Sequence, residues 1–414
     1  MRLLFVTPYF PPYQVGGAEE STVALAMALQ ERGHEVRILT LQLGDAQDQL
    51  PLSVERIDVG ARMDEPGRPL RPKTFERPGL QLRVARAISH AARYADLVHC
   101  QTLHLLPAAY LGARRARVPV AATIRDMMGV CSIAVCLLDH DRVPADCSLL
   151  KLERECLPRY REVYGVAESL RHTAAVLALY VTARGRSAVL RRCDGVFAVS
   201  EEVARLYENA GLIRLGSARQ LPNIAANELP PRADGERDIA IYAGKVSPGK
   251  GVAYLLEAVA LARERAPDLR LVVVGRAEEP WLTRLRAPQV EYRGWIAREN
   301  LLSLYDRARF AVVPSVWPEP LPRAALEAAA AGVAVVGTRV GGTPEVITHE
   351  ETGLLVPPRD APALADAFVR LWHDQELGSA LGTGAQERVG ATFSAQAVAS
   401  KAEELYEELI ERGR

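Results

Sequence analysis

The chain has 414 residues, which is too long for one ordinary hydrophobic core and predicts two domains. A hydrophobic content of 49% with 25% charged residues is typical of a folded globular protein and excludes a disordered one. The formal net charge of zero argues against nucleic acid as the main partner, because nucleic-acid-binding proteins carry a basic surface. No apolar run reaches the roughly 20 residues of a membrane-spanning helix, and the first eight residues predict a strand, not a signal peptide. We therefore expect a cytoplasmic protein, and peripheral contact with the inner face of a membrane stays open.

The first half of the sequence alternates strand-like and helix-like segments. Strands are predicted at residues 3–7, 35–40, 97–100, 119–124 and 195–199, and helices at 19–30, 80–94, 106–116 and within 157–192. This order, in which a helix separates successive strands, predicts a parallel sheet covered by helices. Residues 126–156 form the least regular stretch, and long loops of this kind tend to carry function.

A polar, proline-containing segment at residues 228–237 predicts a linker. After it, strands are predicted at 239–243, 269–275, 290–292, 310–314 and 333–337, and helices at 252–263, 298–307, 323–331, 362–372 and 395–412. The sequence therefore predicts two doubly wound α/β domains, over residues 1–225 and 226–393, that face a central cleft. The last segment, 394–414, is predicted to be a helix that packs back toward the first domain.

Each half begins with a strand that leads into a glycine-containing loop. Gly16 and Gly17 stand directly before a helix, where glycine lets backbone N–H groups approach an anion, although an ordinary tight turn has the same composition. Lys245 and Lys250 stand in the corresponding loop of the second half. Only five lysines occur among the 51 basic residues, so their pairing here is unusual. Because lysine is a compact charge suited to a diphosphate, we prefer phosphate binding to a solvated basic turn.

Residues 317–327 combine two glutamates with the start of a helix. The prolines in this stretch predict an extended loop around Glu319, and Pro322 precedes an alanine-rich helix that contains Glu327. A helix N-terminus attracts phosphate, and nearby carboxylates accept hydrogen bonds from neutral hydroxyls. The pattern indicates a phosphorylated ligand that is rich in hydroxyls. A helix-dipole carboxylate beside an unrelated surface glutamate is an equally simple alternative.

Four of the six cysteines cluster at Cys131, Cys136, Cys147 and Cys156. None of them forms a C-x-x-C pair, so we prefer reduced thiols in a packed loop to a structural metal site. The number of cysteines is also too small for a secreted disulfide scaffold.

Several segments, all in one order, resemble the glycosyltransferases of family 4, which have the GT-B fold. The resemblance covers nearly the whole chain and is most specific in the second half. The matching segments are the Gly16-Gly17 loop, residues 118–126, Leu221-Pro222-Asn223, Gly244-Lys245 with Lys250-Gly251, the E-x7-E pair of Glu319 and Glu327, and residues 341–345 and 352–357.

The resemblance implies a retaining transfer of a sugar from a nucleoside-diphosphate sugar to an acceptor hydroxyl. Lys245 and Lys250 would hold the diphosphate, Glu327 the ribose hydroxyls, and Glu319 the donor sugar. The implied catalytic residues are Glu319, Lys250, Lys245 and Asp126. The implied donor-binding residues are Gly16, Gly17, Lys245, Lys250, Trp295, Ile296, Glu319, Leu321, Pro322, Arg323, Ala324 and Glu327.

The sequence departs from the family pattern at three positions. Arg125 precedes Asp126 where the family usually has histidine, and this pair is expected on the acceptor side, with an ion pair between the two as the alternative. Lys245 replaces a common arginine, which keeps the charge but loses the bidentate geometry. Pro322 replaces a common glycine and removes one backbone N–H donor.

The resemblance also implies a UDP- or GDP-sugar as substrate, no cofactor and no metal. The acceptor is expected to be a glycan, a lipid-linked molecule or a small molecule. Two alternatives remain at this stage: a nucleotide-sugar epimerase of the same architecture, and a non-catalytic subunit that binds a nucleotide sugar.

Overall fold

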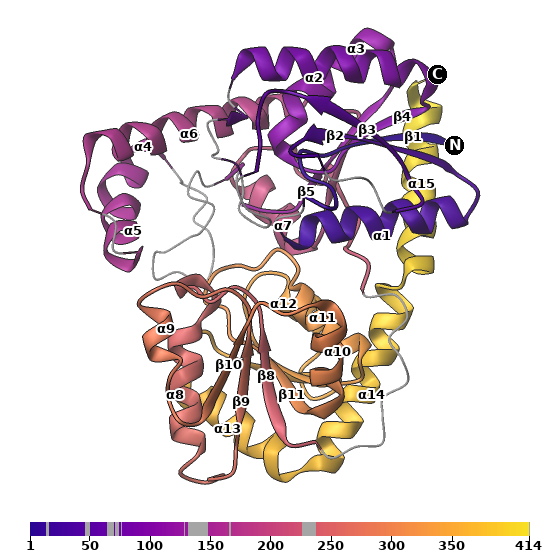
Figure 1. The fold of residues 1–414 in the computed structure, drawn as a ribbon. Helices are drawn as coiled ribbons and strands as arrows, with labels where there is room; N and C mark the ends of the chain where they lie inside the picture. Colours follow the sequence, from indigo (N-terminus) through magenta and orange to yellow (C-terminus); the bar gives the residue numbers. More distant parts are fainter. Residues whose placement is uncertain are drawn as a thin grey trace.

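The computed structural model describes residues 1–13, 16–45, 50–63, 70, 74–75, 77–127, 129–130, 148–164, 167–225 and 237–413. These residues form two α/β units, each built on a parallel sheet, as Figure 1 shows. Cys131, Cys136, Cys147 and nearly all of the predicted linker at 228–237 lie outside the described residues.

The first sheet has seven strands in the order β3-β2-β1-β4-β5-β6-β7. All of its neighbouring strands pair in parallel. The strands are β1 (Arg2–Val6), β2 (Glu35–Gln42), β3 (Ser53–Asp58), β4 (Leu97–Cys100), β5 (Val120–Ile124), β6 (Gly195–Ala198) and β7 (Ala218–Gln220).

Helices cover both faces of this sheet because its central strands are apolar on both sides. Leu3 and Phe5 of β1 pack into one buried cluster with α1 and α15, and Leu4 and Val6 pack into another with α2 and α3. The helices of this half are α1 (Gly17–Glu31), α2 (Pro78–Ala91), α3 (Leu106–Ala116), α4 (Leu149–Lys151), α5 (Leu157–Tyr164), α6 (Leu170–Leu190) and α7 (Glu201–Asn209).

The second sheet has six parallel strands in the order β10-β9-β8-β11-β12-β13. They are β8 (Ile239–Ala243), β9 (Leu271–Val274), β10 (Val290–Gly294), β11 (Ala308–Val313), β12 (Ala334–Thr338) and β13 (Gly353–Val356). The helices are α8 (Val252–Ala262), α9 (Trp281–Arg284), α10 (Arg298–Arg307), α11 (Arg323–Ala330), α12 (Thr343–Val346), α13 (Ala361–His373), α14 (Gln375–Thr392) and α15 (Ala395–Gly413).

The last helix, α15, returns to the first sheet and lies beside α1 (Figure 1). Glu403 of α15 accepts a hydrogen bond from Arg32 Nε at 2.8 Å. Tyr406 lies fully buried, with its hydroxyl 2.7 Å from Nδ1 of His99. The C-terminal helix therefore completes the core of the N-terminal half.

Both sheets have the same doubly wound order, with the first strand of each half between the second and the fourth. In such sheets, ligands bind beyond the carboxyl ends of the strands where the order reverses. Here these are the loops after β1 and β4 in one sheet and after β8 and β11 in the other. All the residues that carry the glycine, lysine and glutamate patterns lie in or directly after these loops.

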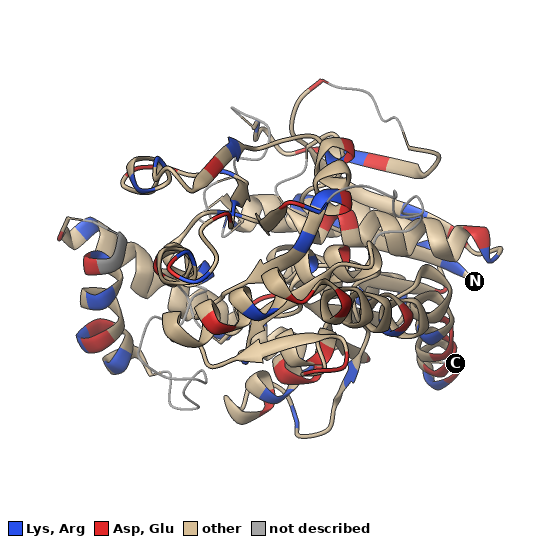
Figure 2. Cartoon of the chain, turned by 90° about the horizontal axis from the view of Figure 1, so that it is seen from below, with Lys and Arg blue, Asp and Glu red and all other residues tan. Residues whose placement is uncertain are grey.

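The two parallel α/β sheets confirm the fold class predicted from the sequence. Three strands (β3, β7 and β13), two longer helices (α7 and α14) and three short ones (α4, α9 and α12) were not among the predicted elements. Basic and acidic residues are interspersed on the same helices (Figure 2), as expected for a chain with no net charge. Among the described residues, no helix combines the length and the apolar composition needed to cross a membrane.

Candidate active site

The lysine turn after β8, Pro248–Lys250, packs against the residues that follow β11. Pro248–Lys250 forms one 3₁₀ turn, and Gly251 then takes a positive φ of 72° before α8 begins. A Cβ atom on Gly251 would lie 1.7 Å from the carbonyl oxygen of Pro314, so only glycine fits here. The backbone N–H of Val316 donates to the carbonyl oxygen of Gly249 at 3.0 Å, and this hydrogen bond holds the two loops together.

This close approach brings Lys250 to Glu319. The Lys250 ammonium donates to Oε1 of Glu319, and the Ser315 hydroxyl donates to the same oxygen at 2.6 Å. Lys250 Nζ also lies 5.3 Å from the centre of the Trp317 ring, within cation–π range. Glu319 is only 4% exposed. The structure therefore joins the lysine turn to the first glutamate in an ion pair whose carboxylate is buried.

A glycine pair after β12 fixes the backbone of Glu319. The N–H of Gly342 donates to the carbonyl oxygen of Glu319 at 2.7 Å. Gly341 has a positive φ of 55°, and a Cβ atom there would lie 2.2 Å from the same carbonyl oxygen. A side chain on Gly341 would therefore displace the loop that carries Glu319.

The helix α11 begins directly after this loop. Pro322 is its N-cap, and the first helical hydrogen bonds run from the N–H groups of Ala325 and Leu326 to the Pro322 carbonyl at 3.1 and 3.2 Å. The N–H groups of Arg323 and Ala324 come before this ladder. They are therefore the donors that a helix N-terminus offers to an anion.

Glu327 lies one turn into α11 and contacts two arginines. Arg323 Nη2 is 3.1 Å from its Oε1, and Arg298 Nη1 is 3.7 Å from the same atom. Arg298 is the first residue of α10, so it links Glu327 to the loop that contains Trp295 and Ile296. Trp295 is 68% exposed in that loop.

Arg323 also joins the two halves of the molecule. Its Nη1 donates to Ser21 Oγ at 2.9 Å, and its Nη2 lies 2.8 Å from Glu20 Oε2. Both partners are in the first two turns of α1. A Cβ atom on Gly17 would lie 2.2 Å from Cδ of Arg323, so the absence of a side chain at Gly17 makes room for this arginine. Gly16 caps the same helix, and its N–H donates to Glu19 at 2.7 Å.

Glu345 of α12 makes a second bridge between the halves. Its carboxylate accepts hydrogen bonds from the N–H groups of Glu201 and Glu202 at 3.0 Å each, and from Gln220 Nε2 at 2.8 Å. It therefore caps α7 from the opposite sheet. Burial raises the pKa of Glu345, and the two backbone hydrogen bonds act against that shift.

Arg125 follows β5 at the carboxyl edge of the first sheet. Its Nε donates to the backbone carbonyl of Gln101 at 3.1 Å, its Nη2 to Gln101 Oε1 at 2.6 Å, and its Nη1 to Asn223 Oδ1 at 2.5 Å. The side chain is partly exposed, yet its surroundings are dense enough that burial lowers the pKa of Arg125 to about 10. The backbone carbonyl of the neighbouring Asp126 accepts from the Tyr207 hydroxyl at 3.0 Å.

The structure thus gathers part of the predicted set around one place. Contacts join Lys250, Ser315 and Glu319, and Arg323 pairs with Glu327 on the helix that follows their loop; we call these five residues the donor corner. The predicted residues that make no hydrogen bond or ion pair with the donor corner in the described part of the chain include Lys245, which is exposed, Trp295 and Ile296.

Five contact residues escaped the sequence analysis: Ser21, Gln101, Arg298, Ser315 and Glu345. All but Ser315 act through a partner in another segment of the chain, and Ser21 and Arg323 are 302 residues apart. Glu345 ends the glycine-containing segment 341–345, which was matched to the family pattern without a role for this residue. The other four stand in no recognisable pattern.

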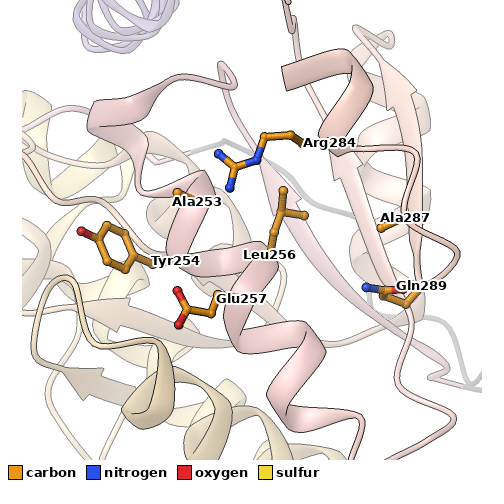
Figure 3. Close-up of a pocket in the computed structure, with 7 residues that line it drawn as sticks. All are labelled: Ala253, Tyr254, Leu256, Glu257, Arg284, Ala287 and Gln289. Carbon is orange, nitrogen blue, oxygen red and sulfur yellow. The ribbon is translucent and has the colours of Figure 1, made fainter. Parts of the chain in front are cut away.

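An open hollow of about 670 Å³ lies elsewhere on the second half. It is lined by α8 and the segment after α9, and Figure 3 shows Tyr254, Glu257 and Arg284 around it. None of its lining residues belongs to the predicted site. Within the described ranges, no three His, Cys, Asp or Glu side chains gather as metal ligands.

Comparison with known proteins places this chain in a family. Residues 15–223, just over half of the chain, match the model described as Glycosyltransferase Family 4. Residues 237–374 match the model described as Glycosyl transferases group 1. The chain belongs to glycosyltransferase family 4.

Individual proteins agree with this assignment. The chain is 30% identical to the putative glycosyltransferase YtcC of Bacillus subtilis over 42% of its own length and 46% of that protein, less than half of this relative. It is 26% identical to a glycogen synthase of Mycobacterium tuberculosis, over 98% of this chain and 94% of that one. Its fold resembles that of Anabaena Alr3699/HepE, solved with UDP and glucose, with a TM-score of 0.70 and 18% identity over 99% and 100% of the two chains. The fold of this family 4 chain is therefore GT-B.

Proposed function

We propose that this protein transfers a sugar, with retention of its anomeric configuration, from a nucleoside-diphosphate sugar to an acceptor hydroxyl. The observation that carries the proposal is the donor corner. There, a lysine turn, a buried glutamate and the first turn of α11 meet beside the start of α1 from the other half. Positive groups for a diphosphate and carboxylates for sugar hydroxyls therefore occur together.

In the proposed complex, the diphosphate takes the contacts of Lys250 and of the Arg323 and Ala324 N–H groups. Because Lys250 then exchanges Glu319 for phosphate, the Glu319 carboxylate is released to accept hydrogen bonds from the donor sugar. Glu327 accepts from the ribose hydroxyls. Lys245 is exposed and stands earlier in the same loop, from where it reaches the outer phosphate oxygens.

The bond from the anomeric carbon to the diphosphate oxygen breaks, and a bond to the acceptor oxygen forms on the same face of the sugar. The acceptor proton passes to the departing phosphate oxygen. Negative charge grows on the diphosphate while the sugar becomes oxocarbenium-like, so fixed positive groups stabilise the transition state more than the ground state. No carboxylate nucleophile of the kind used by retaining hydrolases is needed.

The proposed donors are UDP- and GDP-sugars. The HepE structure contains UDP and glucose, and here the exposed Trp295, with Ile296, borders the proposed base site. We place Arg125 and Asp126 on the acceptor side.

The test compares Lys250→Ala with wild type by calorimetry and thermal shift, with UDP, GDP and their hexose conjugates as probes. We expect a loss of about 1–3 kcal/mol of binding free energy, the range for a charge-assisted contact. Lys245→Ala is the matched variant in the same loop, and its loss should be smaller because its side chain is exposed. Unchanged donor affinity in Lys250→Ala contradicts the proposal.

The product distinguishes the proposal from the two alternatives. A glycosylated acceptor detected by mass spectrometry supports the transferase. An epimerised nucleotide sugar, or donor binding without transfer to any acceptor, contradicts it.

A further inference from the structure

Arg125 occupies a central place at the edge where substrates are expected. It follows β5 directly, and its guanidinium lies over the end of β4, where Gln101 holds it through both backbone and side chain. The charge of Arg323, which belongs to the donor corner, is near enough to contribute to lowering the pKa of Arg125. The Arg125 side chain therefore lies close to the junction of the two halves.

The hydrogen-bond partners of Arg125 are all neutral. Its three hydrogen bonds go to amide oxygens of Gln101 and Asn223. A guanidinium has five N–H groups, so two remain, one on each terminal nitrogen. Neither has a hydrogen-bond partner among the described residues. The carboxylate of Glu19, which accepts from the Gly16 N–H, acts on Arg125 electrostatically and not through a hydrogen bond among the described residues.

Arg114 of α3 is held differently. Arg114 is a good comparison because it acts at the other end of β5. Its Nη2 lies 2.9 Å from the Asp194 carboxylate, and that carboxylate accepts the N–H of Val120, the first residue of the strand, at 2.8 Å. At the carboxyl end of β5, the Arg125 guanidinium is equally well anchored, but none of its hydrogen-bond partners among the described residues is a carboxylate.

A cation removed from water without a bonded anion is unfavourable for folding. Anchoring by neutral oxygens fixes the guanidinium plane and preserves its full charge for a ligand. Two N–H groups, one on each terminal nitrogen of an anchored guanidinium, suit a carboxylate or a phosphate, which have several oxygen lone pairs to accept them. A sugar hydroxyl needs neither the charge nor the fork.

We propose that Arg125 is a specificity-determining residue that binds an anionic group, a carboxylate or a phosphate, carried by one of the two sugar substrates in addition to the donor diphosphate. This inference rests on the proposed function, because it assumes that the substrates meet between the two sheets. The diphosphate itself is assigned to Lys250 and the start of α11 on the opposite sheet. The anion recognised by Arg125 therefore sits on the donor sugar or on the acceptor.

The experiment uses the full chain and matched substrate pairs. The donor arm compares UDP-glucose with UDP-glucuronic acid, and GDP-mannose with GDP-mannuronic acid. The acceptor arm compares a neutral hexose with its 6-phosphate. Donor binding, donor hydrolysis and transfer are measured for wild type, Arg125→Gln, Arg125→Lys and the control Arg114→Gln.

We expect wild type to prefer the anionic member in one arm by about tenfold or more, the factor that one charge-assisted contact provides. Arg125→Gln should remove the preference, Arg125→Lys should retain part of it because the charge stays but the fork is lost, and Arg114→Gln should leave the ratio unchanged. The arm that shows the preference identifies which substrate carries the anion.

Equal use of charged and neutral substrates by wild type in both arms overturns the inference, and this measurement needs no variant. The affinity of Arg125→Gln is also measured for UDP and GDP alone. A loss as large as the loss for the whole nucleotide sugar overturns the inference, because Arg125 would then contact the diphosphate. Failure of the proposed function looks different: no nucleotide sugar binds to wild type at all.

Discussion

The donor corner and the surroundings of Arg125 hold their charges in opposite ways. In the donor corner, Lys250 is paired with Glu319, and Arg323 with Glu327 and Glu20. Arg125 is held only by neutral oxygens, and behind Gln101 the buried ring of His99 continues the network to Tyr406. One region holds its charges in ion pairs, which we propose that a ligand exchanges, and the other holds a fixed charge without an ion pair among the described residues.

This difference predicts different responses to substitution. Removing one partner from an ion pair leaves the other uncompensated in a buried place. The donor corner should therefore show large functional effects. The hydrogen bonds of Arg125 continue through Gln101 and His99 to Tyr406, between β4, β5 and α15. Substitutions in this network should therefore mainly change specificity and stability.

Glu319→Gln gives the largest expected effect. The amide still accepts hydrogen bonds but no longer stabilises the positive charge that develops on the sugar, so kcat should fall by about 100-fold, more than donor affinity changes. Steady-state kinetics and calorimetry measure the two quantities separately. Glu257→Gln, in the outer hollow of Figure 3, is the matched control and should leave kcat unchanged. A variant with wild-type kcat removes Glu319 from the reaction.

Two glycine substitutions test whether the lysine turn or the start of α1 is the more constrained. Gly251→Ala places a methyl group against the backbone oxygen of Pro314 at a positive φ, so we expect a loss of about 2–3 kcal/mol in the free energy of unfolding. Gly17→Ala meets only the flexible side chain of Arg323, so its stability should stay within about 1 kcal/mol of wild type. Urea denaturation measures the free energy of unfolding of both variants. Equal losses would contradict the expectation that the lysine turn is more constrained than the start of α1.

The sequence predicted the central strands well because they are short and apolar, as in β8 and β11. It missed α14, whose four glycines weaken any helical prediction. The structure gives the reason for one of them: a Cβ atom on Gly382 would lie 2.2 Å from the carbonyl oxygen of Gly332. Glycine here permits close packing of a helix and does not end it. The three-residue, polar β7 has no period from which to predict a strand.

The candidate site was predictable where one loop carries its own pattern, as with Lys250, Glu319 and Glu327. It was not predictable where function depends on which loops meet. Nothing near Arg125 in the sequence shows that Gln101 and Asn223 will anchor it, because 24 and 98 residues separate them from it. An ion pair with the adjacent Asp126 was therefore an equally good expectation, and the hydrogen bonds to Gln101 and Asn223 arise only from the order of the strands in the sheet.

His99, which lies behind the anchor of Arg125, provides the test with the smallest expected effect. Its Nε2 lies 2.6 Å from Thr123 Oγ1 and its Nδ1 2.7 Å from the Tyr406 hydroxyl, and burial, followed by the charge of Arg125, lowers the pKa of His99 well below its ordinary value. The unfolded chain therefore binds a proton near pH 6.5 that the folded protein does not bind. The free energy of unfolding should decrease as pH falls below about 6.5, by up to about 1.4 kcal/mol per pH unit for this one proton.

The stabilisation is present above pH 6.5 and is lost toward the lower pKa of the folded state. His104, whose pKa burial lowers to about 4, adds a slope of the same sign over pH 6.5 to 4. Denaturation of wild type and His99→Gln across pH 7.5 to 5 measures the difference. The variant should be less stable at pH 7.5, because it loses buried hydrogen bonds, and should show a shallower dependence on pH. Parallel profiles would contradict this, because they would mean that His99 binds its proton equally well in the folded and the unfolded protein.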